Sequence, residues 1–230
     1  METKDRGSLA EEMMEDALLL EELRPARRRQ LYLMVKRAQD LFLSLLALVV
    51  LSPVLLLIAL AVVIDDPRGG PLFTQTRCGQ WGKEFRLYKF RTMYIDAEER
   101  LEALLPYNEM TGPAFKIRND PRVTRFGRLL RSMGLDELPQ LLNILRGDMS
   151  IVGPRPPLPR EVVKYTPHQR LRLAVKPGLT CFWQVCPARN SLGFDSWVEL
   201  DLHYIRERSW LLDWKLIFLT IRAVVKREGM

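Results

Sequence analysis

The chain has 230 residues, with 35 lysines and arginines against 28 aspartates and glutamates, so its formal net charge is +7. This length suits one globular domain plus a membrane segment, and the basic charge suits anionic lipid headgroups, nucleotides or nucleic acid. Three cysteines form no even disulfide framework, and two histidines give no zinc-type cluster, so a bound metal would be an oxygen-liganded hard cation such as magnesium.

Residues 1–30 form a charged N-terminal extension that is first acidic and then basic. Residues 11–23 could form an amphipathic helix that ends at Arg24-Pro25. The acidic character of this helix argues against membrane binding. A regulatory role or a homodimer contact fits it better.

An apolar segment without any charge covers residues 41–64, which is long enough to cross about 30 Å of hydrocarbon. Ser52-Pro53 lies at its middle, where proline predicts a kink and Ser52 can donate a hydrogen bond to a freed carbonyl. Basic residues flank both ends, whereas a simple span predicts an asymmetry of charge. Both ends could therefore lie on the cytoplasmic face. An ordinary kinked transmembrane anchor explains the segment equally well.

The rest of the chain predicts a mainly α protein with a small β-hairpin, an α+β fold class. The hairpin is expected from residues 71–77 and 84–90, around Gly79-Gln80-Trp81-Gly82. Residues 210–227 mix tryptophans, aliphatic residues and cations, which fits an interfacial amphipathic helix or a helix packed on the core equally well. Further helices are predicted over residues 93–105, 122–132, 136–146, 160–174 and 196–208.

Two adjacent carboxylates, Asp136 and Glu137, stand near the start of a predicted helix. Alone they would be typical of a helix N-cap and an exposed first-turn acid. Arg131 precedes them, however, and Arg155 follows on a proline-rich loop. Arginines beside a carboxylate keep it ionised and nucleophilic, and they also bind phosphate oxygens in a bidentate manner. One acid could then attack a phosphate ester while the other holds a divalent cation.

The second hairpin strand ends in further cations, Lys89 and Arg91, which could bind phosphate or simply form a solvated patch. Several short motifs follow one another in a fixed order: Lys36-Arg37 with Asp40, Ser52-Pro53, Phe73-Thr74-Gln75, Tyr88-Lys89-Phe90-Arg91-Thr92-Met93, Leu135-Asp136-Glu137-Leu138-Pro139-Gln140, Gly147-Asp148-Met149-Ser150-Ile151-Val152-Gly153-Pro154-Arg155-Pro156 and Lys176-Pro177-Gly178-Leu179-Thr180. In this combination the chain resembles the bacterial sugar transferase family, the monotopic polyprenyl-phosphate phosphoglycosyl transferases, from about residue 36 to residue 229.

The resemblance implies transfer of a sugar-1-phosphate from a UDP-sugar to undecaprenyl phosphate, with release of UMP. It implies a ping-pong mechanism with a covalent intermediate on Asp136, and Mg²⁺ bound by Glu137 with Asp136. The implied phosphate- and substrate-binding residues are Lys89, Arg91, Arg131, Asp148, Pro154, Arg155, Gln184 and Arg189. Relatives usually read Gln-Val-(Ser/Asn)-Gly-Arg-Asn near the last two, whereas this chain reads Gln184-Val185-Cys186-Pro187-Ala188-Arg189-Asn190.

The resemblance also implies a re-entrant membrane helix over residues 31–66, broken at Ser52-Pro53. Residues 67–230 would be the catalytic domain with a C-terminal interfacial helix, on the cytoplasmic face of the bacterial inner membrane. The reaction would initiate an exopolysaccharide, an O-antigen or a related glycan. The alternative is an inactive membrane-anchored scaffold or binding protein of the same fold, against which the intact acid pair argues. No nucleic-acid partner is expected, because no nucleic-acid-binding motif is recognised.

Overall fold

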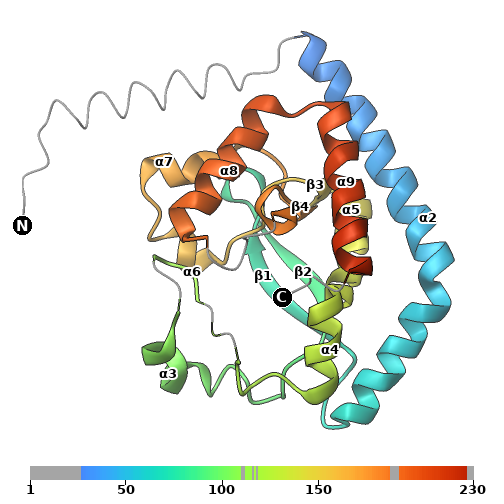
Figure 1. Cartoon of the computed structure of the whole chain (residues 1–230), viewed down its shortest axis with the longest axis vertical. Helices are drawn as coiled ribbons and strands as arrows, with labels where there is room; N and C mark the ends of the chain where they lie inside the picture. Colours follow the sequence, from blue (N-terminus) through green and yellow to red (C-terminus); the bar gives the residue numbers. More distant parts are fainter. Residues whose placement is uncertain (1–26, 110–111, 116, 118, 187–191, 227–230) are drawn as a thin grey trace, which may run out of the picture.

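The computed structural model describes residues 27–109, 112–115, 117, 119–186 and 192–226. The predicted helix over residues 11–23 and the predicted site residue Arg189 lie outside these ranges. The described part is mainly helical, with one long apolar helix near the N-terminus and a small antiparallel hairpin (Figure 1). The predicted fold class is confirmed at this level.

The long helix α2 (Arg27–Asp65) has 39 residues and continues through Pro53. Pro53 has no N–H to donate to the carbonyl of Val49, four residues earlier. The hydroxyl of Ser52 donates to that same carbonyl over 2.8 Å, as predicted. The prediction that the helix breaks at Ser52-Pro53 is wrong, since α2 continues through both residues as one bowed helix (Figure 1). The Ser52 hydrogen bond satisfies the carbonyl that Pro53 leaves without a partner.

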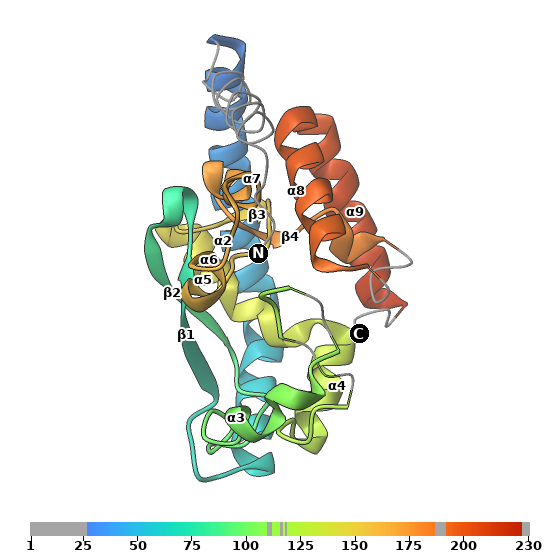
Figure 2. The same ribbon diagram turned by 90° about the vertical axis from the view of Figure 1, so that its left-hand side faces the viewer.

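Both ends of α2 contact the same globular body, which lies along the inner side of the bow (Figures 1 and 2). Near its start, Lys36 Nζ pairs with Asp213 over 2.9 Å. Arg37 donates to the carbonyls of residues 144 and 145 at the end of another helix. Near its end, Ile58 and Val62 are buried in an apolar cluster with side chains of the body. Residues 30–65 are long and apolar enough to cross a membrane.

The predicted hairpin is confirmed as the antiparallel strands β1 (Leu72–Cys78) and β2 (Glu84–Phe90). The short 3-10 helix η1 (Gln80–Gly82) connects them. Side chains alternate between the two faces of a strand. Phe73 is paired with Lys89 and Arg77 with Phe85, which places these four side chains on one face of the hairpin. This face matters below because two of them are cations.

Two predicted helices are wrong in extent. Only α3 (Leu101–Leu104) and η2 (Leu105–Tyr107) form within residues 93–105 and just beyond, because Met93 pairs as an isolated bridge with Val123 and a turn follows it. Residues 160–174 form three short pieces because Thr166 caps a new helix that starts at a proline. These pieces are α6 (Pro159–Val162), α7 (Pro167–Arg170) and η4 (Leu171–Ala174).

The remaining helices differ less from prediction. Helix α4 (Arg125–Met133) starts three residues late because Thr124 caps it. The helix expected over 136–146 begins as the 3-10 helix η3 (Leu135–Gln140), which contains a proline, and continues as α5 (Leu141–Arg146). Helices α8 (Phe194–Glu207) and α9 (Trp210–Val225) confirm the last two predictions within two residues.

Sequence analysis missed a short parallel pair, β3 (Ser150–Val152) and β4 (Gly178–Thr180). Gly153, just after β3, lies against Gly178, the first residue of β4, where a Cβ on Gly178 would be 2.1 Å from the Gly153 nitrogen. The main apolar core lies beside this pair and joins it to α8 and α9. A last 3-10 helix, η5 (Trp183–Val185), follows β4.

Candidate active site

Asp136 and Glu137 lie in η3, the tight turn between α4 and α5 that packs against β2. The Asp136 side chain is buried, with 8% of the residue exposed. Glu137 forms an ion pair with Arg155, in which Arg155 Nη1 lies 2.9 Å from Glu137 Oε1. The structure therefore brings three of the predicted site residues together.

Two further predicted cations, Lys89 from β2 and Arg131 from α4, act electrostatically on Asp136. Arg131 donates its Nε–H to the hydroxyl of Thr92 over 2.8 Å, which fixes the guanidinium at the end of β2. Lys89 Nζ lies 5.2 Å from the centre of the Phe73 ring on the paired strand. Each cation is thus held by a neighbour that does not neutralise it.

The electrostatics of Asp136 differ from the sequence-based expectation. Burial raises the pKa of Asp136, and the neighbouring Glu137 raises it further. Lys89, Arg131 and Arg155 lower it, but burial outweighs them. The arginines therefore act in the expected direction, toward the ionised carboxylate, while burial opposes them. Burial also lowers the pKa of Lys89 to about 8.

Arg155 stands on a backbone that has little freedom to move. The carbonyl of Pro154 accepts the N–H of Gly178 over 2.9 Å, and Gly153 donates to the carbonyl of Thr180. The contact between Gly153, just after β3, and Gly178, the first residue of β4, has no room for a side chain. Consequently the parallel pair positions Arg155 beside Glu137. Pro154 acts through its backbone.

Arg77 is a further cation of this site that the sequence did not single out, being one of the basic residues that follow the apolar segment. It projects from the same hairpin face as Lys89 and interacts electrostatically with Arg155 and Glu137. Its Nη1 donates to the carbonyl of Pro156, the residue after Arg155, over 2.9 Å. The sequence carries a signal that could have identified Arg77. Residues 73, 75 and 77 alternate onto one face of β1, and the pairing of Phe73 with Lys89 places Lys89 on that same face.

Other predicted binding residues have different partners. Arg91 is buried and donates to the carbonyls of Asp66 and Gly69, so it ties the end of α2 to the hairpin. Asp148 accepts a hydrogen bond from Asn143 over 3.3 Å, and Gln184 accepts one from the Cys181 thiol. Arg189 lies outside the described residues. A phosphate-binding role for these residues stays a prediction.

The predicted magnesium ion has a plausible donor set but no closed cage. Among the described residues, no group of three or more His, Cys, Asp or Glu side chains could hold a metal. Mg²⁺ commonly takes one or two carboxylates and completes its shell with water and substrate phosphate oxygens. The adjacent carboxylates of Asp136 and Glu137 fit that requirement.

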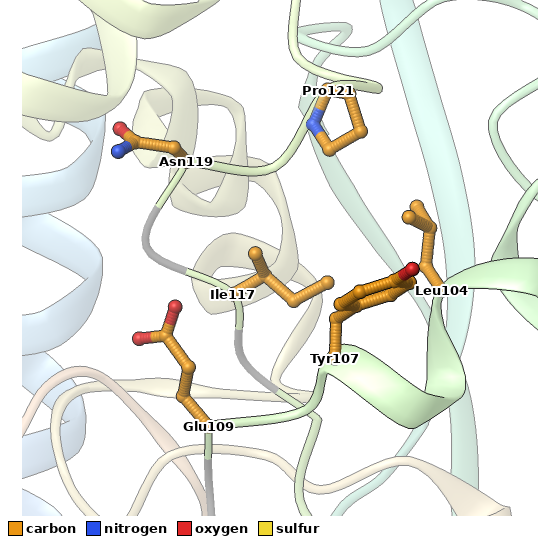
Figure 3. A pocket seen from close by; sticks show the side chains of 6 residues that line it. All are labelled: Leu104, Tyr107, Glu109, Ile117, Asn119 and Pro121. Carbon is orange, nitrogen blue, oxygen red and sulfur yellow. The ribbon is translucent and has the colours of Figure 1, made fainter.

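A separate pocket lies beside the loop that follows η2 (Figure 3). Its lining contains no residue of the acid pair or of the cations around it. The six lining residues are Leu104, Tyr107, Glu109, Ile117, Asn119 and Pro121.

A buried Asp136 and a half-buried Glu137 lie among cations, on a body packed along a long apolar helix. This arrangement defines a protein suited to binding phosphate groups beside a candidate membrane helix. Residues 31–227 match the family model of the bacterial sugar transferases, and the chain belongs to that family.

Curated relatives support this membership. The chain is 42% identical over 199 residues to the galactosyl transferase CpsE of Streptococcus agalactiae, covering 86% of this chain and 44% of that protein. It is 38% identical over 200 residues to the undecaprenyl-phosphate galactose phosphotransferase of Salmonella typhimurium, covering 85% and 41%. It is 40% identical over 201 residues to the exopolysaccharide production protein ExoY of Rhizobium meliloti, covering 85% and 88%. The chain thus spans less than half the length of the first two relatives.

Proposed function

We propose that the chain transfers a sugar-1-phosphate from a UDP-sugar to undecaprenyl phosphate and releases UMP, as an initiating step of exopolysaccharide or related glycan synthesis. The observation that carries this proposal is the buried Asp136, on which Lys89, Arg131 and Arg155 act electrostatically, next to a Glu137 that pairs with Arg155. The printed names of two relatives, phosphotransferases for undecaprenyl phosphate with galactose or with glucose, support the substrate class.

In the first half-reaction, an ionised oxygen of Asp136 would attack the phosphorus that carries the sugar. The bond from this phosphorus to the bridging oxygen would break, and UMP would leave with the electron pair. Lys89 and Arg131, which act electrostatically on Asp136, would neutralise the phosphoryl oxygens during attack by a carboxylate. Mg²⁺, held by Glu137 and Asp136, would supply further neutralisation of phosphate charge.

In the second half-reaction, a phosphate oxygen of the lipid would attack the same phosphorus. The bond from Asp136 to phosphorus would break and regenerate the carboxylate. Burial of Asp136 excludes much of the water that would otherwise hydrolyse the intermediate. The sugar phosphate would thus stay bound to Asp136 after UMP has left and before the lipid attacks, which is a ping-pong mechanism.

We further propose a monotopic arrangement in which α2 enters the cytoplasmic membrane and returns to the cytoplasmic face. A straight helix of this length would extend about 58 Å at 1.5 Å per residue, and would place its ends on opposite sides of a bilayer. Here one globular body contacts Lys36 near the start of α2 and Asp66 just beyond its end. In α9, Leu211 and Phe218 are exposed, which suits an interfacial helix beside α2.

The test is UMP release by the purified chain with Mg²⁺, undecaprenyl phosphate and a panel of UDP-sugars. Asp136→Asn is expected to lower release by about 10³-fold or more, because the amide is not a nucleophile. Asp65→Asn, at the exposed end of α2, is the matched control and should retain activity. Chelation with EDTA should also abolish release.

Radiolabelled UDP-sugar without the lipid separates the mechanism from the overall reaction. Label bound to the wild-type protein, and absent from Asp136→Asn, is the expected result. Release of UMP by Asp136→Asn at the wild-type rate would refute the assigned nucleophile. No release by the wild type with any sugar of the panel would favour an inactive binding protein.

A further inference from the structure

Arg77 and Arg155 are neighbouring guanidinium groups that share the acid Glu137. Arg155 pairs with Glu137 directly, and Arg77 interacts electrostatically with both. Glu161 also acts on Arg77, but its carboxylate accepts the backbone N–H of Leu158 over 2.9 Å. Two partly desolvated cations that share one carboxylate keep a net positive charge, which a further anion bound beside them would neutralise.

Arg77 also has hydrogen-bonding capacity left over. A guanidinium carries five N–H donors. One of them binds the carbonyl of Pro156 and another binds the side-chain oxygen of Gln75. The Nε–H is buried and has no acceptor among the described residues. Burial and the neighbouring Arg155 lower the pKa of Arg77 to about 10, which still leaves it charged near neutral pH.

The chemistry of the proposed reaction requires a place for a phosphate monoester. When UMP departs, its phosphate changes from a diester-like group with one negative charge into a dianion. The lipid phosphate arrives as a dianion and loses one negative charge when it forms the diphosphate. In an in-line double displacement the acceptor enters where the leaving group departed, opposite the Asp136 oxygen. One dianion site can therefore serve both partners.

We propose that Arg77 and Arg155 together form this phosphate-monoester site, occupied in turn by the departing UMP and by the incoming polyprenyl phosphate. The proposal rests on the proposed function and assigns Arg77 a role beside Arg155. Lys89 and Arg131, which act on Asp136, would bind the phosphoryl group that is transferred. Paired guanidiniums suit the dianion because each can bind two phosphate oxygens.

The first experiment measures binding of UMP, uridine and inorganic phosphate to wild type, Arg77→Ala and Arg77→Lys in detergent by calorimetry. Arg86→Ala is the matched control, because Arg86 is exposed on the same hairpin and pairs with Thr76 on the opposite face from Arg77. Arg77→Ala is expected to weaken UMP binding by about 10-fold to 100-fold, as for loss of a charged hydrogen bond. Uridine binding should be unchanged, and Arg86→Ala should match the wild type.

The second experiment measures KM for the UDP-sugar and for undecaprenyl phosphate. Arg77→Ala should raise both. An effect on the donor alone, or on the lipid alone, would overturn the shared site. If Arg77 only supports the Pro156 carbonyl, kcat would fall while the ratio of UMP to uridine affinity stays at the wild-type value, which would also overturn the proposal.

A second variant and a binding assay that needs no turnover separate failure of this proposal from misfolding and from failure of the proposed function. If Arg77→Ala fails to fold, Arg77→Lys retains the charge without the bidentate fork, and its expected UMP affinity lies about 10-fold below wild type. Binding of UMP needs no turnover, so a wild type that binds UMP but releases none contradicts the proposed function alone. A wild type and an Arg77→Ala variant with equal UMP affinity contradict the dianion site alone.

Discussion

Replacement of Asp40 should test how the long helix α2 supports the candidate site. Asp40 is buried, although it stands at the edge of the apolar segment. Its Oδ2 accepts the hydroxyl of Ser150 over 2.7 Å, and its Oδ1 accepts the backbone N–H of Ile151 over 3.1 Å. Both donors belong to β3, which leads directly to Arg155.

The magnitude follows from these two bonds. Each hydrogen bond to a charged acceptor contributes about 1.5–3 kcal/mol, and Asp40→Ala removes the acceptor of both donors, the buried Ser150 hydroxyl and the part-buried Ile151 N–H. The desolvation cost of the carboxylate offsets part of this loss. We expect Asp40→Ala to lower the free energy of unfolding by about 2–4 kcal/mol. Asp40→Asn keeps one acceptor and should lose about half as much.

The assay is denaturant unfolding in detergent micelles, with UMP release measured on the same samples. Asp65→Ala removes an exposed acid from the other end of the same helix, and should change stability by less than about 0.5 kcal/mol. Because Asp40 holds β3, release should also fall in Asp40→Asn under conditions where that variant stays folded. Equal unfolding free energies for Asp40→Ala and Asp65→Ala would refute the reasoning.

Two further predictions concern the pH profile and the glycine contact. Lys89, with its pKa lowered to about 8, should lose its charge as pH rises through 8, so kcat/KM for the donor should fall there. Lys89→Arg stays charged and should move this alkaline limb upward by more than a unit; an unchanged limb would exclude Lys89 as its source. Gly178→Ala would place a Cβ 2.1 Å from the Gly153 nitrogen and should lower stability by about 1–3 kcal/mol in thermal unfolding. Gly70→Ala, with open space around its position, should be neutral, and equal melting temperatures for the two variants would contradict the predicted clash.

Local signals in the sequence were enough to predict much of the fold. The alternation around Gly79-Gln80-Trp81-Gly82 predicted the hairpin, and the uncharged segment predicted the long helix. The adjacency of Asp136 and Glu137 and the order of the motifs indicated the family. These features depend on neighbouring residues, so a pattern of period 2 or 3.6 is sufficient to reveal them.

Pairing between distant segments was decided only by the tertiary structure. Strands β3 and β4 have three residues each and are joined by a long connection, so neither carries a periodic signal of its own. Their contact positions Arg155, and the hairpin register brings Arg77 to the same place. The pKa of Asp136 likewise depends on burial, which outweighs the nearby cations whose presence the sequence reveals. Desolvation and long-range contacts are properties of the packed molecule. For that reason the sequence identified the acids of this site and the cations Lys89, Arg131 and Arg155, but neither Arg77 nor the burial that raises the pKa of Asp136.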